Sequence, residues 1–228
     1  MSTRSALLRF HAIVSVPMLL LVGTSAQAGY QDVTGMVQVV SPPPSLLLGS
    51  YQSDSSVRTF LERQQFTLAS DVRVDNTATG TFASNNALVS GTIAAGTSVD
   101  SYFFHSEPVN PSQFYTGSVT FTTAILGVIV LSTSLDASDA QLGVPGTTYP
   151  TGLIARGLEL IPTGDSFTIS ADRKTLTFAL NTRIVVDELR VLTAPSAVPE
   201  PVSAVLLGTG SLILLIFRSR GFSRLRNS

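Results

Sequence analysis

Cysteine and tryptophan are both absent from the 228-residue chain, and lysine occurs once, as Lys174. Without cysteine the chain forms no disulfide, so its stability has to come from hydrophobic packing and backbone pairing. Histidine occurs only as His11 and His105, which is too few for a zinc site built from histidine and cysteine. The lack of tryptophan also weakens the case for a platform on which sugar rings stack.

The first 28 residues have the parts of an export signal. Arg4 and Arg9 make a positively charged start, and an apolar run follows from residue 12 to residue 22. Ala26 and Ala28 then provide small side chains at the two positions that a signal peptidase recognises. A membrane anchor is the alternative, but the run has only about half of the ~20 residues that a spanning helix needs. We therefore predict export, with cleavage after Ala28.

A second apolar run, from residue 202 to residue 217, lies near the C-terminus. A helix over this run would be roughly 24 Å long, somewhat shorter than a ~30 Å hydrocarbon core. A helix in a soluble core would keep a polar face, and residues 213–217 have none. The run is followed by a basic tail of Arg218, Arg220, Arg224 and Arg226. By the positive-inside rule, this tail predicts a transmembrane helix with a cytoplasmic C-terminus and a body on the opposite side of the membrane.

Pro199, Glu200 and Pro201 stand directly before this run. The order of Pro-Glu-Pro, apolar helix and basic tail resembles the PEP-CTERM sorting signal of Gram-negative bacteria. The resemblance implies processing near the motif by an exosortase, which is a membrane protease-transpeptidase. It also implies a bacterium that makes exopolysaccharide and a biofilm or floc matrix. The chain departs from the family in one respect, since residues 221–223 and Leu225 dilute the basic cluster.

These signals divide the chain into a signal peptide (1–28), a body (29–192), a linker (193–198) and a sorting signal (199–226). The signal peptide holds two basic residues, and the sorting signal holds four basic residues and Glu200. The body keeps 8 basic and 14 acidic residues, which is a net charge of −6. An acidic body argues against nucleic acid as a partner.

The body has the pattern of short strands separated by turns. Residues 117–123 alternate between apolar and hydroxyl side chains, which is typical of a strand with one buried face. Residues 125–131 are continuously apolar and predict a central strand that is buried on both faces. One short helix is expected at 134–142, with Ser134 as its N-cap. Further strands are predicted at 33–40, 57–68, 87–93, 97–105, 158–161, 166–170, 175–180 and 184–192, with 87–93 paired to 97–105.

Strands at about 8–12-residue spacing, with Thr- and Ser-rich outer faces and Gly/Pro turns, are typical of sandwiches and barrels. We therefore predict an all-β fold, an antiparallel β-sandwich or jelly roll with one short helix. To this the two ends would add a signal-peptide helix and a C-terminal transmembrane helix.

Candidate chemistry centres on His105, because it is the only histidine outside the signal peptide. The side chains from Asp100 to Glu107 alternate, so His105 and Glu107 share one face of a strand. The pair could face a ligand, and the alternative is a polar pair at the rim of the sheet. A Ser-His-Asp triad through His105 is formally possible, but the sequence has no nucleophile-elbow motif. We expect no catalytic residue.

Acidic residues near the predicted helix and turns raise the question of a metal. Asp136, Asp139 and Gln141 could supply oxygen ligands to calcium, but they lack the EF-hand spacing and could equally cap or solvate a helix. Asp165 and Asp172 flank a predicted strand and are expected to be turn residues. We expect neither a metal site nor a cofactor.

The sequence thus predicts an exported, non-enzymatic protein that is anchored in the inner membrane as a precursor and then becomes extracellular or cell-surface. By the resemblance, it would act in or near the exopolysaccharide matrix. One alternative is a carbohydrate-binding module, with or without calcium, and another is a secreted hydrolase that uses His105. Expected partners are signal peptidase, an exosortase, the membrane through the C-terminal helix, and exopolysaccharide.

Overall fold

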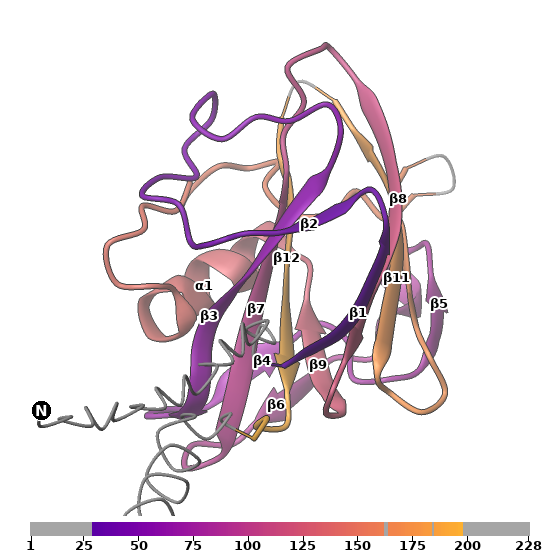
Figure 1. The fold of residues 1–228 in the computed structure, drawn as a ribbon. Coiled ribbons are helices and arrows are strands. Elements are labelled where there is room, and N and C mark those ends of the chain that lie inside the picture. The colour runs from indigo at the N-terminus through magenta and orange to yellow at the C-terminus, as the bar shows by residue number, and fades with distance from the viewer. Residues whose placement is uncertain (1–28, 162–163, 184, 198–228) are drawn as a thin grey trace, which may run out of the picture.

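The computed structural model describes residues 29–161, 164–183 and 185–197. This part of the chain is mostly β, with antiparallel sheets and one α-helix, as the sequence predicts (Figure 1). The helix is α1 (Ser132–Leu142), and a short 3-10 helix is η1 (Asn85–Ala87). The strands are β1 (Tyr30–Gly35), β2 (Val37–Val39), β3 (Val57–Thr67), β4 (Val72–Val74), β5 (Gly80–Phe82), β6 (Gly91–Ile93), β7 (Ser98–Ser106), β8 (Gln113–Phe121), β9 (Ile125–Ile129), β10 (Ser166–Ile169), β11 (Thr175–Thr182) and β12 (Asp187–Thr193).

Two five-stranded sheets make up most of the fold. Sheet A has the order β1-β8-β11-β10-β5, and sheet B has the order β2-β3-β7-β12-β9. The pairs within these sheets are antiparallel except β2 and β3, which run parallel. Strands β4 and β6 form a small separate sheet.

The main hydrophobic core lies between sheets A and B, which face each other in Figure 1. Phe121 and Leu176 of sheet A belong to the same buried cluster as Tyr102, Phe104 and Val191 of sheet B. The rings of Tyr102 and Phe121 have centroids 4.7 Å apart. Alternation along β8 and β11 therefore places apolar side chains inward and hydroxyl side chains outward, as the sequence pattern predicts for 117–123.

A second hydrophobic cluster covers the other face of sheet B. Phe103 and Leu192 of this sheet pack there with Leu135 of α1, Val74 of β4 and Ile93 of β6. Strands β7 and β12 are consequently buried on both faces over almost their whole length. Any charged residue on these strands is therefore removed from water and needs a partner.

The predicted pairing of 87–93 with 97–105 is wrong. Strand β6 pairs with β4, whereas β7 lies between β3 and β12. The reason is that Val72, Val74 and Ile93 bury their apolar side chains by packing together on the outer face of sheet B.

The run at 125–131 forms a buried strand, β9, but it lies at the edge of sheet B and not in its centre. The small sheet covers it closely, because a Cβ on Gly127 would fall 2.7 Å from Cγ2 of Val74. A continuous apolar run thus indicates that both faces of the strand are buried, but it does not indicate that the strand is central in its sheet. An edge strand is also buried on both faces when another layer covers it.

The helix begins at Ser132, two residues earlier than predicted, and Ser134 is not its N-cap. The N-cap residue is Leu131, which makes no side-chain capping bond. Asp75, from a distant part of the chain, instead fixes the residues that lead into the helix. Its carboxylate accepts the backbone N–H groups of Val130 (2.8 Å) and Leu131 (2.9 Å) and the hydroxyl of Ser134 (2.6 Å).

The strand predicted at 158–161 is not formed. Leu158 and Leu160 still point into the main core, and the backbone N–H of Leu158 donates to the carbonyl of Val130 at 2.8 Å. Alternating apolar residues here reflect burial of a loop that runs along the sandwich.

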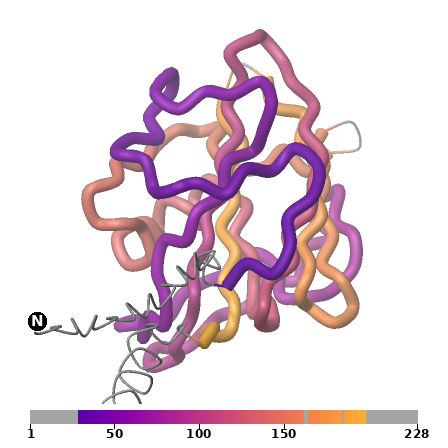
Figure 2. The backbone as a smooth tube through the Cα atoms, viewed as in Figure 1, coloured from indigo at the N-terminus to yellow at the C-terminus, as the bar shows by residue number. Residues whose placement is uncertain are grey.

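Both ends of the described body lie beside the turn between β8 and β9 (Figure 2). The carbonyl of Gly29 accepts the N–H of Thr122 at 2.9 Å, and the N–H of Ala194 donates to the carbonyl of Ala124 at 2.8 Å. Strand β12 places Thr193 at this end and Asp187 at the opposite end, where it pairs with Ser106.

Candidate functional sites

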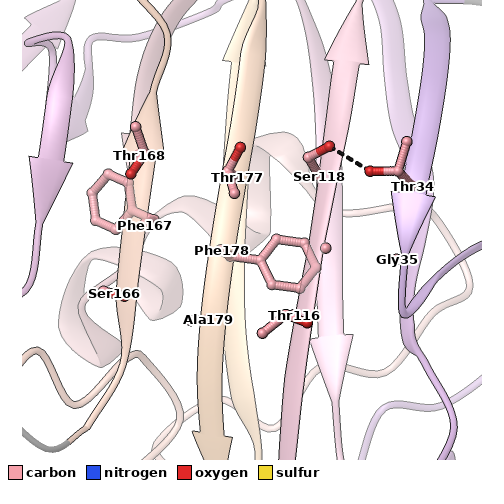
Figure 3. Close-up of a pocket in the computed structure, with 11 residues that line it drawn as sticks. Thr34, Gly35, Thr116, Ser118, Ser166, Phe167, Thr168, Thr177, Phe178 and Ala179 are labelled. Atoms are coloured by element: carbon pink, nitrogen blue, oxygen red, sulfur yellow. Dashed lines mark hydrogen bonds between the residues drawn. The ribbon is translucent and has the colours of Figure 1, made fainter.

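A row of five hydroxyl side chains crosses the whole outer face of sheet A. The register places one residue of each strand in this row, namely Thr34, Ser118, Thr177, Thr168 and Thr81. With strands ~4.8 Å apart, the row is roughly 19 Å long. The hydroxyls of Thr34 and Ser118 lie 2.8 Å apart, as Figure 3 shows, and those of Thr81 and Thr168 are also 2.8 Å apart. We call this surface the hydroxyl face.

A shallow, open groove of about 440 Å³ runs over the hydroxyl face. Four members of the row line it, together with Thr116 and Ser166 from the next row along the strands. The lining contains no charged residue. Phe114 of β8 lies further along the same face and is 56% exposed. The groove therefore offers neutral donors and acceptors with one aromatic side chain nearby.

A network of charged side chains is buried between sheet B and helix α1. At its centre, Arg190 of β12 donates two bonds to the carboxylate of Glu62, at 2.6 and 2.8 Å. The same guanidinium donates to Asp139 of α1 at 3.0 Å and to the hydroxyl of Ser138. Tyr149 completes this part by donating its hydroxyl to Glu62 at 2.7 Å.

Arg156 forms the second half of the network. Its guanidinium donates to Glu188 of β12 at 2.5 Å, to Asp136 at 2.7 Å and to Asp139 at 2.6 Å. Arg156 and Glu188 are fully buried. Asp136 and Asp139 therefore serve as counter-ions that hold α1 on sheet B, and their oxygens already accept from guanidinium groups and, for Oδ2 of Asp136, from the N–H of Gly152. Gln141, the third residue considered for calcium, bonds to Ser70.

His105 lies at the end of this network and not at a rim. Its side chain is 1% exposed, its Nδ1 is 2.8 Å from Glu188, and its Nε2 is 3.6 Å from Glu107. Burial by itself lowers the pKa of His105, but the nearby carboxylate of Glu107 and the hydrogen-bonded carboxylate of Glu188 outweigh burial and raise the pKa above its ordinary value. The sequence correctly placed His105 and Glu107 on one face, but a polar pair at the rim was wrong because residues 49–51 cover them: the ring of Tyr51 lies 6.0 Å from that of His105, and the N–H of Gly49 donates to Glu107.

The network has the residue types of a catalytic site without the access that one needs. His105 and Glu188 are 1% and 0% exposed, so a substrate could reach His105 only by displacing packed side chains. The hydroxyl of Ser106 bonds to Thr182 and to the carbonyl of Asp187. Adjacent residues of a strand point to opposite faces, so Ser106 and His105 do not form a nucleophile–base pair.

The two acidic residues that the sequence assigned to turns, Asp165 and Asp172, have different surroundings in the structure. Asp172 lies in the turn before β11, where it accepts the hydroxyl of Ser170 and the N–H of Lys174, so the predicted turn role fits. Asp165 also fixes a loop, but it gathers with Glu159 and Asp187 into a group that could hold a metal ion. Glu159 and Asp187 had no sequence signal, because the three residues come from separate segments with no ligand spacing.

The sorting and export residues lie outside the described residues. These are Ala26, Ala28, Pro199, Glu200, Pro201 and the four arginines of the tail. The predicted transmembrane segment, 202–217, also lies outside them. Within the part of the chain that the structure describes, no helix is long and apolar enough to cross a membrane.

Comparisons with protein-family models, with curated proteins and with solved structures find no match to this chain. The functional argument therefore depends on the residues and the geometry.

Proposed function

We propose that this chain is an exported protein of the cell surface or extracellular matrix, and that its body is a non-enzymatic antiparallel β-sandwich. In this proposal an exosortase processes the precursor at Pro199, Glu200 and Pro201. The body then contacts neutral polysaccharide through the hydroxyl face of sheet A.

The row of five hydroxyls is the observation that carries the proposal for the body. Each hydroxyl can both donate and accept, so the row can match successive hydroxyls of an extended sugar chain. Each such bond replaces a bond to water and contributes only about 0.5–1.5 kcal/mol. We therefore expect weak binding that depends on many contacts along one polymer, which suits a matrix component.

Charge favours neutral polymers over acidic ones. The body carries a net charge of −6, and the groove on the hydroxyl face has no basic residue in its lining. An acidic polysaccharide would therefore be repelled at low ionic strength and would find no cation to bind.

The buried charge network supports a non-enzymatic body. His105 is the only histidine among the described residues, and it is enclosed by Glu188, Glu107 and the packing around them. A structural role explains every contact that His105 makes.

Binding of the full chain, purified in a mild non-ionic detergent, to insoluble polysaccharides tests this proposal. We expect retention on cellulose, chitin or cross-linked dextran and none on cross-linked alginate, which is acidic. Thr177→Glu, in the middle of the row, should abolish retention, because it places a charge where the sugar would lie. Thr92→Glu, on exposed strand β6, is the matched control and should bind normally. Equal retention of both variants would contradict the assignment of the hydroxyl face.

A further inference from the structure

Three carboxylates meet at the end of the sandwich opposite the two described chain ends. Glu159, Asp165 and Asp187 each offer one oxygen, and these oxygens all lie within 4.8 Å of one another. Asp165 and Asp187 are each 1% exposed, whereas Glu159 is exposed. We call these residues the acidic trio.

Asp187 has an unpartnered oxygen inside the trio. Its Oδ2 accepts the hydroxyl of Thr182, but its Oδ1 is buried without any hydrogen-bond partner. A buried carboxylate oxygen without a donor is costly, because it has lost water and gained nothing in exchange. Burial, followed by the negative charge of Asp165, raises the pKa of Asp187 to about 8, which shows how strongly this site opposes a further negative charge.

Protein cations do not neutralise the trio. Among the described residues, no Lys, Arg or His side chain forms an ion pair with Glu159, Asp165 or Asp187. Arg183 lines the same hollow as Glu159 and Asp165, but it is exposed and has a smaller effect on the pKa of Glu159 than burial or the charge of Asp165. The trio is therefore left without a basic side chain in direct contact, and a bound cation would supply that contact.

Hydrogen bonds hold the trio in place. The backbone N–H groups of Glu159 (2.7 Å) and Asn181 (2.8 Å) donate to the two oxygens of Asp165. Thr182, which orients Asp187, is itself 2.9 Å from the hydroxyl of Ser106. Carboxylates that ligate metals are fixed in this way by a surrounding shell of donors.

A hollow of about 290 Å³ gives access to Glu159 and Asp165 from solvent, whereas Asp187 lies behind them and is not in its lining. The lining also contains Ile161, Gly164, Asn181, Arg183 and Val185. An ion could therefore enter with bound water and keep part of that water as ligands.

We infer that Glu159, Asp165 and Asp187 bind a calcium ion. All three ligands are hard oxygen donors, and calcium takes six to eight oxygens at ~2.3–2.6 Å, so oxygens that share one ion lie at most ~5 Å apart. Magnesium needs shorter bonds and stricter octahedral geometry and fits a set of three spread carboxylates less well. This inference is independent of the hydroxyl face, because none of the three carboxylates lines the groove on that face. The ion would tie the 159–165 segment to the ends of β11 and β12.

Calcium titration of the full chain in detergent, first treated with EDTA, tests the inference. Binding is followed by isothermal calorimetry and by thermal unfolding of the body. We expect one site, and at about 100 times its Kd calcium should raise Tm by roughly 5–10 °C. Magnesium chloride at the same concentration should give a clearly smaller shift.

Substitutions locate the site. Glu159→Gln should reduce affinity at least about tenfold, and because Glu159 is exposed this variant should still fold. Asp187→Asn should also abolish the calcium response. Asp172→Asn, at an exposed acid in a turn, is the matched control and should bind as the wild type does.

Two outcomes would overturn the inference. The first is that calcium at about 10 mM gives neither heat nor a Tm shift in the wild type. This concentration is well above the Kd of extracellular calcium modules, which is about 0.1–1 mM. This outcome would mean that bound protons neutralise the trio. The second is an equal calcium response in the wild type and in Glu159→Gln, which would place calcium elsewhere. Neither outcome bears on polysaccharide binding, so the two proposals fail separately.

Discussion

Each buried guanidinium of this protein contacts carboxylates from two different elements. Arg190 joins Glu62 of β3 to Asp139 of α1, and Arg156 joins Glu188 of β12 to Asp139. Taking such ions out of water is costly, and only complete pairing makes their burial tolerable. The network therefore fixes where α1 lies on sheet B, in the way that an apolar contact alone would not.

His105 tests the contribution of one network residue to stability. His105→Ala removes the bond to Glu188 and the imidazole beside Glu107, while Arg156 remains on Glu188. We expect the free energy of unfolding to fall by about 2–3 kcal/mol, since two buried carboxylates lose a polar partner and a cavity is left in its place. Urea unfolding monitored by tyrosine fluorescence measures it. A loss below about 0.5 kcal/mol, the level of a surface change, would mean that His105 is not part of a closed network.

His105→Gln then isolates the titration of the imidazole. The folded pKa of His105 is raised, so the stability it contributes is fully present below the unfolded pKa of about 6.5 and is lost as pH rises through the folded pKa. The difference in unfolding free energy between wild type and His105→Gln should therefore be larger at pH 5.5 than at pH 8.5. A difference that grows with pH would contradict the raised pKa.

Helix α1 shows at the scale of an element how a distant residue can replace a local signal. Asp75 accepts three donors around the start of α1, and two of them are backbone N–H groups. Asp75→Ala should lower the free energy of unfolding by about 2–4 kcal/mol, because buried donors lose their acceptor. Asp71→Ala, which removes one bond to the exposed N–H of Ala95, should cost about 0.5 kcal/mol. Urea denaturation of both variants gives the comparison, and equal costs would refute the role of Asp75 in fixing the residues that lead into α1.

The elements show which parts of the fold a sequence can predict. Alternation correctly predicted the strand around 117–123 and its outward hydroxyls, because period-two burial depends only on neighbouring residues. The pairing of 87–93, the edge position of β9 and the start of α1 depended on contacts with distant segments. Local patterns carry no information about such contacts.

The candidate sites likewise combine features that local sequence patterns predict with features that depend on distant contacts. The hydroxyl face follows from outward Thr and Ser residues, but only the strand order aligns five of them in one row. His105 and Glu107 were found from alternation, whereas Glu188 and the arginines beside them were not. Arg190 alternates with Leu189 and Val191, which suggests a solvent-facing charge until α1 is known to cover that face.

At the scale of the whole molecule, the described body closes tightly around its first residue. Gly29 has φ +87°, and a Cβ on it would fall 1.6 Å from the hydroxyl of Tyr102, so no larger residue fits there. Near the other end, Thr193 belongs to β12, and Ser196 is buried with its N–H donating to Asp100 at 2.8 Å. Both ends leave the body at one end of the sandwich.

This arrangement makes the sorting motif testable apart from the body. Glu200→Ala leaves the apolar run 202–217 and the arginines of the tail unchanged, so export and membrane insertion should proceed as in the wild type. Processing should fail, because in our proposal the exosortase recognises Pro199, Glu200 and Pro201. Fractionation of cells in the native bacterium should then find the variant in the inner membrane and the wild type in the extracellular or cell-surface fraction. Ser203→Ala, beside the motif, is the matched control and should be sorted normally. Release of Glu200→Ala at the wild-type rate would show that the motif is not the processing signal.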